Sequence, residues 1–271
     1  MDLKTLREYK KMMEAHRAGL ANKQTRVVSH KTASKDKVET PACRQSLLDE
    51  VKADILTFLK SWPDLLRNEI DFQIHLGSFL LTSPNRYERV FFEYRIPNSW
   101  VSSDYVWDSN LRIDIVVYKN GEYLPVELKY PTALVRRSIE CFDEDLNPDK
   151  DPLEPILKHQ GATDLVCYNF WKDVRRLEVL KKKFKKVKSG LAVLVTNDRK
   201  YIDHDGADTC SLEFCISKNI QSKGPGTLSW RGDVSVAKTR PAINLDGHYP
   251  IRWQSTDIDG VQFNYLILEI K

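Results

Sequence analysis

The chain has 271 residues, of which 41% are apolar and 30% charged, with a formal net charge of +4. This size suits one large domain or two small ones, the composition is ordinary for a globular protein, and the weak basicity does not by itself indicate nucleic acid. No apolar run reaches the ~20 residues of a membrane helix, the first residues lack the apolar core of a signal peptide, and the five scattered cysteines fit no zinc motif. We therefore expect a cytoplasmic protein with reduced thiols and no membrane partner.

Residues 1–44 are predicted to form a basic extension outside the folded core. Leu3 to Leu20 have the spacing of an amphipathic helix, and a polar linker rich in Ser, Thr and Lys follows. Through Gln45 the chain carries eleven Lys or Arg against five Asp or Glu. Two interpretations stay open: an arm that contacts phosphates, or a solubilising tail on which a protein partner or a second copy docks.

Two helices and a strand are expected at the start of the folded core. Apolar residues recur at helical spacing over 44–62, and Pro63 ends that helix. A second helix over 68–82 carries Glu69 in its first turn, where a carboxylate suits the helix dipole. Residues 87–96 are rich in aromatic side chains and predict the first strand.

A β-hairpin is predicted from Arg112 to Pro131. Two runs of alternating apolar residues flank Asn120-Gly121, the strongest short-range signal for a two-residue turn, because both turn positions need positive φ. This turn sets Lys119 opposite Glu122 and thereby fixes every later pair of the two strands.

The predicted register brings three charged side chains to one point. Asp114 falls opposite Glu127 in a non-hydrogen-bonded pair, with Cα atoms roughly 4.5 Å apart, and Lys129 projects from the same face two residues farther on. Facing carboxylates repel each other, and a Mg²⁺ ion, which proteins hold with one or two carboxylates, would relieve that repulsion. The alternative is a solvated sheet face on which Lys129 is the ion-pair partner of both acids.

The predicted hairpin carries Asp114, then a spacer of twelve residues, then Glu127-Leu128-Lys129. This pattern resembles the core motif of the PD-(D/E)xK phosphodiesterases, which include restriction endonucleases, Holliday-junction resolvases and RecB-like exonucleases. Ile113 stands where that motif has its proline. The resemblance implies an α/β restriction endonuclease-like core, with a mixed central sheet flanked by helices. It also implies that Asp114 and Glu127 bind Mg²⁺ or Mn²⁺, with the Leu128 carbonyl as a further ligand, and that Lys129 assists the attacking water.

The same resemblance implies roles for residues outside the hairpin. Family members carry an acidic residue on a helix before the hairpin, which completes the metal shell. Glu69 is the candidate, with Asp71 and Glu93 as rivals and a simple charge at a helix start as the alternative. RecB-like members carry a Gln and a Tyr one turn apart on the helix after the motif, which implies a role for Gln160 in orienting the shell. Here Asp164 stands where that Tyr is expected.

The rest of the chain is expected to complete the fold. Residues 155–188 are predicted as one or two helices and 190–196 as a central parallel strand with both faces covered. These segments, and the β-rich part over 201–271, resemble an uncharacterised bacterial branch of the fold. We expect 45–200 to be the nuclease-like core and 201–271 an elaboration packed on it, whose last strand over 263–270 joins a sheet.

Three further segments bear on the substrate. The connection after the first strand carries Trp100, Tyr105 and Trp107, which either stack bases or pack the loop onto its own core. The segment 140–154 holds seven Asp or Glu and one Lys, and would repel a phosphate backbone unless it moved aside. A basic cluster over 175–188 either follows a phosphate backbone or is a solvated helix end.

These features predict a divalent-metal-dependent nuclease, with DNA favoured over RNA as the substrate. The alternative is a catalytically inactive descendant that serves as a binding or scaffold module. The acidic segment, the incomplete Gln-Tyr pattern and the weak overall charge favour that alternative.

Overall fold

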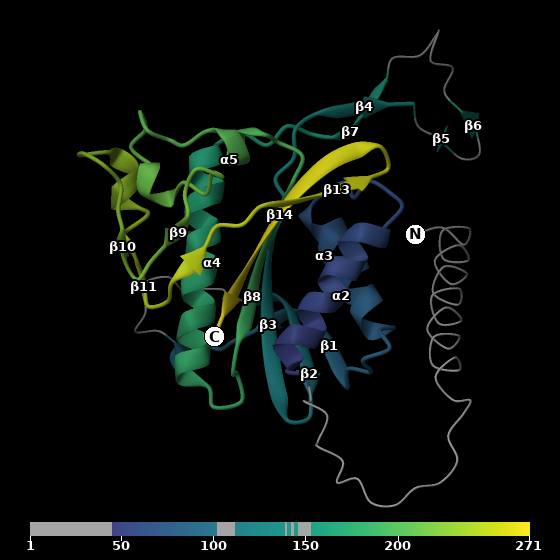
Figure 1. Cartoon of the computed structure of the whole chain (residues 1–271), viewed down its shortest axis with the longest axis horizontal. Helices are drawn as coiled ribbons and strands as arrows, with labels where there is room; N and C mark the ends of the chain where they lie inside the picture. The colour runs from purple at the N-terminus through teal and green to yellow at the C-terminus, as the bar shows by residue number, and fades with distance from the viewer. Residues whose placement is uncertain (1–44, 102–111, 139, 142–143, 146–152) are drawn as a thin grey trace, which may run out of the picture.

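The computed structural model describes residues 45–101, 112–138, 140–141, 144–145 and 153–271, so the predicted N-terminal extension, Tyr105 and Trp107 lie outside the described residues. Its centre is a six-stranded sheet in the order β1-β2-β3-β8-β14-β13 (Figure 1). β3 and β8 run parallel, whereas the other neighbours run antiparallel. The strands are β1 (Arg89–Arg95), β2 (Arg112–Lys119), β3 (Glu122–Lys129), β8 (Gly190–Thr196), β13 (Gln254–Ile258) and β14 (Val261–Ile270).

Helices cover both faces of the sheet, which confirms the predicted mixed sheet flanked by helices (Figure 1). α2 (Leu47–Ser61) and α3 (Glu69–Leu81) pack on one face and α4 (Thr163–Lys183) on the other. Alternate residues of β8 divide between the two layers, since Val193 packs with α2 and α3 whereas Leu194 packs with α4. Burial on both faces explains why β8 is a continuous apolar run.

The hairpin forms with the predicted turn and register. Asn120 and Gly121 have φ values of 52° and 81°, as the two-residue turn requires. Lys119 pairs with Glu122, and the ladder continues to Ile115 opposite Val126. The backbone ladder stops there, one residue before Asp114. The same register carried one residue farther places Asp114 opposite Glu127.

The prediction of helix from residue 155 is wrong. Residues Glu154–Leu157 form strand β7, which pairs with β4 (Val135–Arg137), and α4 begins only at Thr163. Ile156 and Leu157 supplied apolar positions that fitted a helical pattern, but their partner strand lies about twenty residues earlier in the chain, where no local pattern records it.

The C-terminal part contributes to the central sheet as well as packing on it. The last strand joins the sheet as predicted, because β14 pairs with β8, and β13 follows at the edge. The central sheet therefore crosses the boundary predicted at residue 200. The remaining C-terminal residues pack on the outer side of α4, where Trp171 lies in one apolar cluster with Phe214 and Tyr249.

Short elements complete the described residues. These short elements are η1 (Asn98–Trp100), β5 (Glu140–Cys141), β6 (Glu144–Asp145), α5 (Lys200–Asp203), η2 (Leu212–Phe214), β9 (Ser222–Lys223), β10 (Gly226–Leu228), η3 (Ser235–Lys238), β11 (Ile243–Leu245) and β12 (Tyr249–Pro250). No helix in the described part of the chain is long and apolar enough to cross a membrane.

A buried carboxylate ties α2 to the segment between α3 and β1. Asp54 Oδ2 accepts hydrogen bonds from Ser83 Oγ at 2.5 Å, Tyr87 Oη at 2.6 Å and Asn85 Nδ2 at 3.1 Å. Asp54→Ala leaves three donors without their acceptor, so we expect a loss of about 2–4 kcal/mol in the free energy of unfolding. Chemical denaturation measures it, with the exposed Lys60→Ala on the same helix as control. Equal midpoints for the Asp54→Ala and wild-type proteins would show that the network does not stabilise the fold.

Candidate active site

Three elements bring their charged side chains together at the C-terminal end of β3. Lys129 is at the centre, with its Nζ 2.8 Å from Asp173 Oδ2 on α4 and 3.7 Å from Glu69 Oε1 on α3. The same ammonium donates to the Leu128 carbonyl at 2.8 Å. Burial acts to lower the pKa of Lys129, but the surrounding carboxylates outweigh it, Asp173 most strongly, and hold the pKa above its ordinary value.

Glu69 reaches this cluster because of how α3 begins. Asn68 caps the helix, and its Oδ1 accepts from Asp71 N at 2.9 Å. Glu69 is then the first helical residue, and its Oε2 accepts from Tyr130 N at 3.0 Å. The rival Asp71 instead accepts from Arg67 N at 3.1 Å, within the turn that precedes the helix.

Asp114 lies at a break in the sheet. Its Oδ2 accepts from Leu128 N at 2.6 Å, so a side chain takes the place of the backbone ladder between β2 and β3. Its own carbonyl accepts from Gln73 Nε2 at 2.6 Å. Burial raises the pKa of Asp114 to about 6, although Lys129 and the Leu128 N–H act in the opposite direction.

The break extends to β1. The pairs on either side are Phe92 with Ile115 and Tyr94 with Ile113, which leaves Glu93 outside the ladder and opposite Asp114. Glu93 has a φ of 49°, a left-handed conformation that is uncommon for a residue with a side chain. Gln73 bridges the gap, because its Nε2 also donates to Glu93 Oε1 at 2.9 Å. Non-glycine residues in this conformation are concentrated at functional sites.

Glu127 has the most enclosed carboxylate of the cluster, with 3% of its side chain exposed against 4% for Asp173. Its Oε1 is buried without a hydrogen-bond partner among the described residues and lies 3.9 Å from Arg176 Nη1. Burial raises the pKa of Glu127 well above its ordinary value, and the neighbouring Asp173 and Asp114 raise it further. A buried carboxylate oxygen without a hydrogen-bond partner is stabilised by a bound cation or by a proton.

The structure thus places four predicted side chains and the predicted Leu128 carbonyl together, and Gln160 apart. Asp114, Glu127, Lys129 and Glu69 share the cluster. Gln160 precedes α4, its side chain is exposed, and its backbone N–H donates to the Thr132 carbonyl at 3.0 Å. The described hydrogen bonds do not join the Gln160 side chain to the cluster.

Sequence reasoning missed Asp173 and Arg176. Asp173 is nearly as buried as Glu127, and Arg176 Nη1 lies 3.0 Å from Asp173 Oδ1. A signal was present: Asp173 lies on the apolar stripe of α4, between Phe170 and Leu177. A charged residue on an otherwise apolar helix face is buried when the helix packs, and must then find a charged partner.

The chain offers a sparse set of metal ligands. No group of three or more His, Cys, Asp or Glu side chains in the described part of the chain is arranged to hold a metal ion. The donor set that remains is two carboxylates, Asp114 and Glu127, with the Leu128 carbonyl, and Glu69, whose Oε1 lies 3.7 Å from Lys129 Nζ. Two carboxylates suffice for Mg²⁺, which keeps waters as its other ligands.

Comparison with known proteins adds no relative. No protein-family model, no curated protein and no solved structure matches this chain.

Proposed function

We propose that this protein is a nuclease that hydrolyses phosphodiester bonds with Mg²⁺ or Mn²⁺, with DNA favoured as substrate. The observation that carries the proposal is the pairing of a buried, unsatisfied Glu127 oxygen with a second, half-buried carboxylate, Asp114, beside the Lys129 ammonium. Carboxylates whose pKa values are raised by burial and by one another are concentrated at functional sites.

The donor set suits a hard divalent ion. Asp114 and Glu127 would hold it, with the Leu128 carbonyl as a further ligand, and Glu69 would complete the outer shell. Asp114 uses Oδ2 for the Leu128 N–H, and no described residue hydrogen-bonds its Oδ1. When bound, the ion polarises a phosphoryl oxygen and lowers the pKa of a bound water.

Lys129 acts in this proposal as a cation and not as a base. Asp173 and Glu69 keep its pKa raised, so the Nζ retains its proton at neutral pH. From the end of β3 it can hydrogen-bond the attacking water or a phosphate oxygen and stabilise the negative charge that develops at phosphorus. Glu69, whose side chain is 42% exposed, brings the cluster into contact with solvent.

Cleavage assays test the proposal. We expect cleavage of at least one of four substrates, namely linear, circular and single-stranded DNA and RNA, in Mg²⁺ or Mn²⁺ and none in EDTA. The circular substrate separates cleavage within a strand from cleavage at an end. No metal-dependent cleavage of any of the four would contradict the proposal.

The second candidate function is a nucleic-acid-binding module that has lost catalysis. The observation in its favour is that Lys129 is engaged on two sides by Asp173 and Glu69, in a cluster with few metal ligands.

Metal titration separates the two candidates. For the nuclease we expect Mn²⁺ at one hundred times its dissociation constant to stabilise the fold by about 2.7 kcal/mol. The measurement is the melting temperature with and without Mn²⁺, with Glu127→Gln as the control that loses the rise. A wild-type melting temperature that is the same with and without Mn²⁺ would favour the inactive module.

A further inference from the structure

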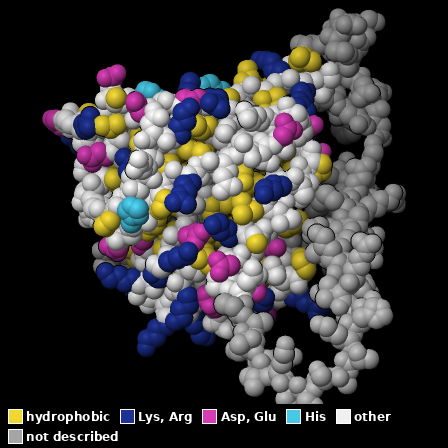
Figure 2. Space-filling model, viewed as in Figure 1, with side chains coloured by type: hydrophobic (Ala, Val, Ile, Leu, Met, Phe, Trp, Pro, Cys, Tyr) yellow, Lys and Arg dark blue, Asp and Glu magenta, His cyan; other side chains and the backbone are white. Residues whose placement is uncertain are grey.

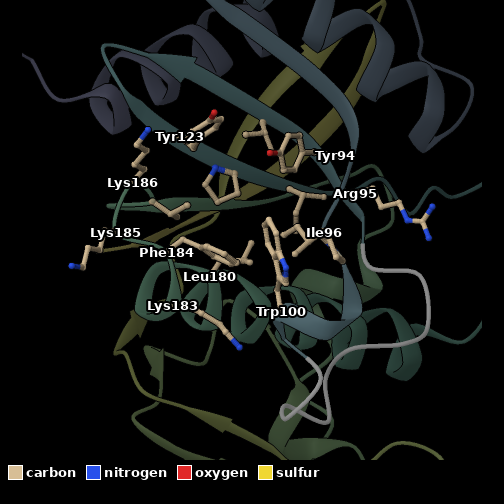
Figure 3. A pocket seen from close by; sticks show the side chains of 15 residues that line it. Tyr94, Arg95, Ile96, Trp100, Tyr123, Leu180, Lys183, Phe184, Lys185 and Lys186 are labelled. Atoms are coloured by element: carbon tan, nitrogen blue, oxygen red, sulfur yellow. The ribbon is translucent and has the colours of Figure 1, made fainter.

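A cavity of about 320 Å³ lies at the C-terminal end of α4, where β1, β2 and β3 face it (Figure 3). Four aromatic rings line it. The ring centroids of Trp100 and Phe184 are 6.1 Å apart, and those of Tyr94 and Tyr123 are 6.4 Å apart. Trp100 is 56% exposed, which is unusual for an indole that contacts another ring at a cavity wall.

Cations surround these rings. Arg95, Lys183, Lys185 and Lys186 line the cavity and are exposed, and no ion pair joins any of them to another described residue. Figure 3 shows their charged ends pointing away from the ring cluster, and Figure 2 shows Lys and Arg side chains gathered at the lower edge, where α4 ends. No Asp or Glu among the described residues lines the cavity. A flat aromatic ligand that carries negative charge matches this lining.

The cavity and the candidate active site share one face of the sheet. Along β3, Pro125 lines the cavity two residues before Glu127, a separation of about 7 Å. Along α4, Leu180 lines it seven residues after Asp173, a separation of about 10 Å. About 10 Å is roughly three times the 3.4 Å rise per base of a stacked strand. A nucleic-acid strand whose phosphodiester bond lies in the active site could therefore place into the cavity a base that is a few nucleotides from that bond.

We propose that this cavity binds one unstacked nucleobase of a single-stranded nucleic acid, with the adjacent phosphates on Arg95, Lys183, Lys185 and Lys186. The base lies against Trp100 and its neighbouring rings. Stacking on aromatic rings beside a basic surface is how proteins hold single strands with little regard to sequence. The choice of nucleic acid over another aromatic anion rests on the proposed nuclease function.

Fluorescence anisotropy with a labelled thymidine 12-mer, in EDTA so that nothing is cleaved, tests the proposal. Trp100→Ala is expected to weaken binding about tenfold and Trp100→Phe no more than about threefold, because Phe keeps a ring for stacking. An abasic 12-mer with the same phosphates is expected to bind the wild type about tenfold more weakly than the thymidine 12-mer does. Its affinity for Trp100→Ala is expected to equal its affinity for the wild type. A uridine 12-mer shows whether RNA is bound as well.

Two charge variants complete the design. The double variant Lys185→Glu with Lys186→Glu is expected to bind both oligomers more weakly than the wild type. Its affinity is also expected to fall less steeply with salt concentration. The exposed Lys238→Glu, far along the chain from the cavity, is the matched control and should bind like the wild type.

Equal binding of the thymidine and abasic oligomers, or wild-type affinity in Trp100→Ala, would overturn the proposal. Trp100-dependent binding of palmitate without any binding of oligonucleotide would also overturn it, in favour of a site for an apolar anion. Metal-dependent cleavage is measured separately. Base-dependent binding without cleavage would refute the nuclease function alone, and cleavage with base-independent binding would refute the pocket alone.

Discussion

Asp114→Asn is expected to stabilise the fold by about 3 kcal/mol at pH 7.5 while it abolishes metal-dependent cleavage. The pKa of Asp114 is about 6 in the folded protein against an ordinary 3.8, because burial disfavours its charged form. Asn removes the buried charge and keeps an oxygen that can accept from the Leu128 N–H. In a chain of this size that gain corresponds to a rise of about 6–12 °C in melting temperature.

The stabilisation depends on pH, and its sign follows from the direction of the shift. Below pH 3.8 the carboxyl is protonated in the folded and unfolded states, and the substitution changes little. Between pH 3.8 and about 6 the unfolded chain ionises while the folded protein retains its proton, so the wild type loses stability relative to Asp114→Asn. Above pH 6 the full difference is reached.

Melting curves at pH 4 and pH 7.5 measure this difference. The exposed Asp233→Asn is the control and should change the free energy of unfolding by no more than about 0.5 kcal/mol. A lower melting temperature for Asp114→Asn at pH 7.5 would instead mark Asp114 as a structural partner of Lys129.

Lys129→Met is expected to act in the opposite direction on stability, with a loss of about 3–5 kcal/mol. Its Nζ lies 2.8 Å from Asp173 Oδ2, and Asp173 and Glu127 are both buried. Without the ammonium, Arg176 is the one cation among the described residues that an ion pair joins to these carboxylates. Cleavage is expected to fall by about 10²–10³-fold, because the charge that stabilises the transition state is lost.

The double variant Lys129→Met with Asp173→Asn separates these two effects. Asp173→Asn removes the carboxylate that has lost its Lys129 partner, so the double variant should recover part of the stability. Cleavage should not recover, since Asn supplies no positive charge. A double variant that regained both stability and cleavage would show that Lys129 only balances Asp173. Denaturation midpoints and initial cleavage rates of the four proteins form the cycle.

The hairpin could be predicted from the sequence because its determinants are local. Asn120-Gly121 fixes the turn, and a strand period of two then fixes which side chains meet. Glu69 could be placed on the first turn of its helix, because Asn68 is a strong capping residue. That Glu69 reaches Lys129 depends on how α3 packs on the sheet, which the local pattern does not contain.

The positions of the other residues of the site could not be predicted, because they depend on contacts between segments that are far apart in the sequence. The apolar pattern predicts Gln160 within a helix, but the residues just before it pair with Val135–Arg137 as a strand. Gln73 lies one turn after Glu69 on α3, and only the packing of α3 on the sheet brings its amide to the break between β1 and β2, where it donates to the Asp114 carbonyl. Asp173 meets Lys129 only once α4 has packed across β3.

The basic cluster after residue 175 divides into two parts for the same reason. Arg175 pairs with Glu178 and Asp246, and Arg176 pairs with Asp173, so both arginines serve the interior and the C-terminal part. Three of the lysines after them, Lys183, Lys185 and Lys186, are exposed and line the aromatic cavity. A sequence records the charges of such a run but not the direction in which each side chain points.

The most direct test of the central claim is the initial rate of nucleic-acid cleavage by wild type and Asp114→Asn at pH 7.5, in Mg²⁺ and in EDTA. We predict cleavage by the wild type in Mg²⁺ alone and none by the variant, although the variant melts at the higher temperature. Equal cleavage by the two proteins, or the same rate in EDTA, would contradict the assignment of this cluster as a metal-dependent phosphodiesterase site.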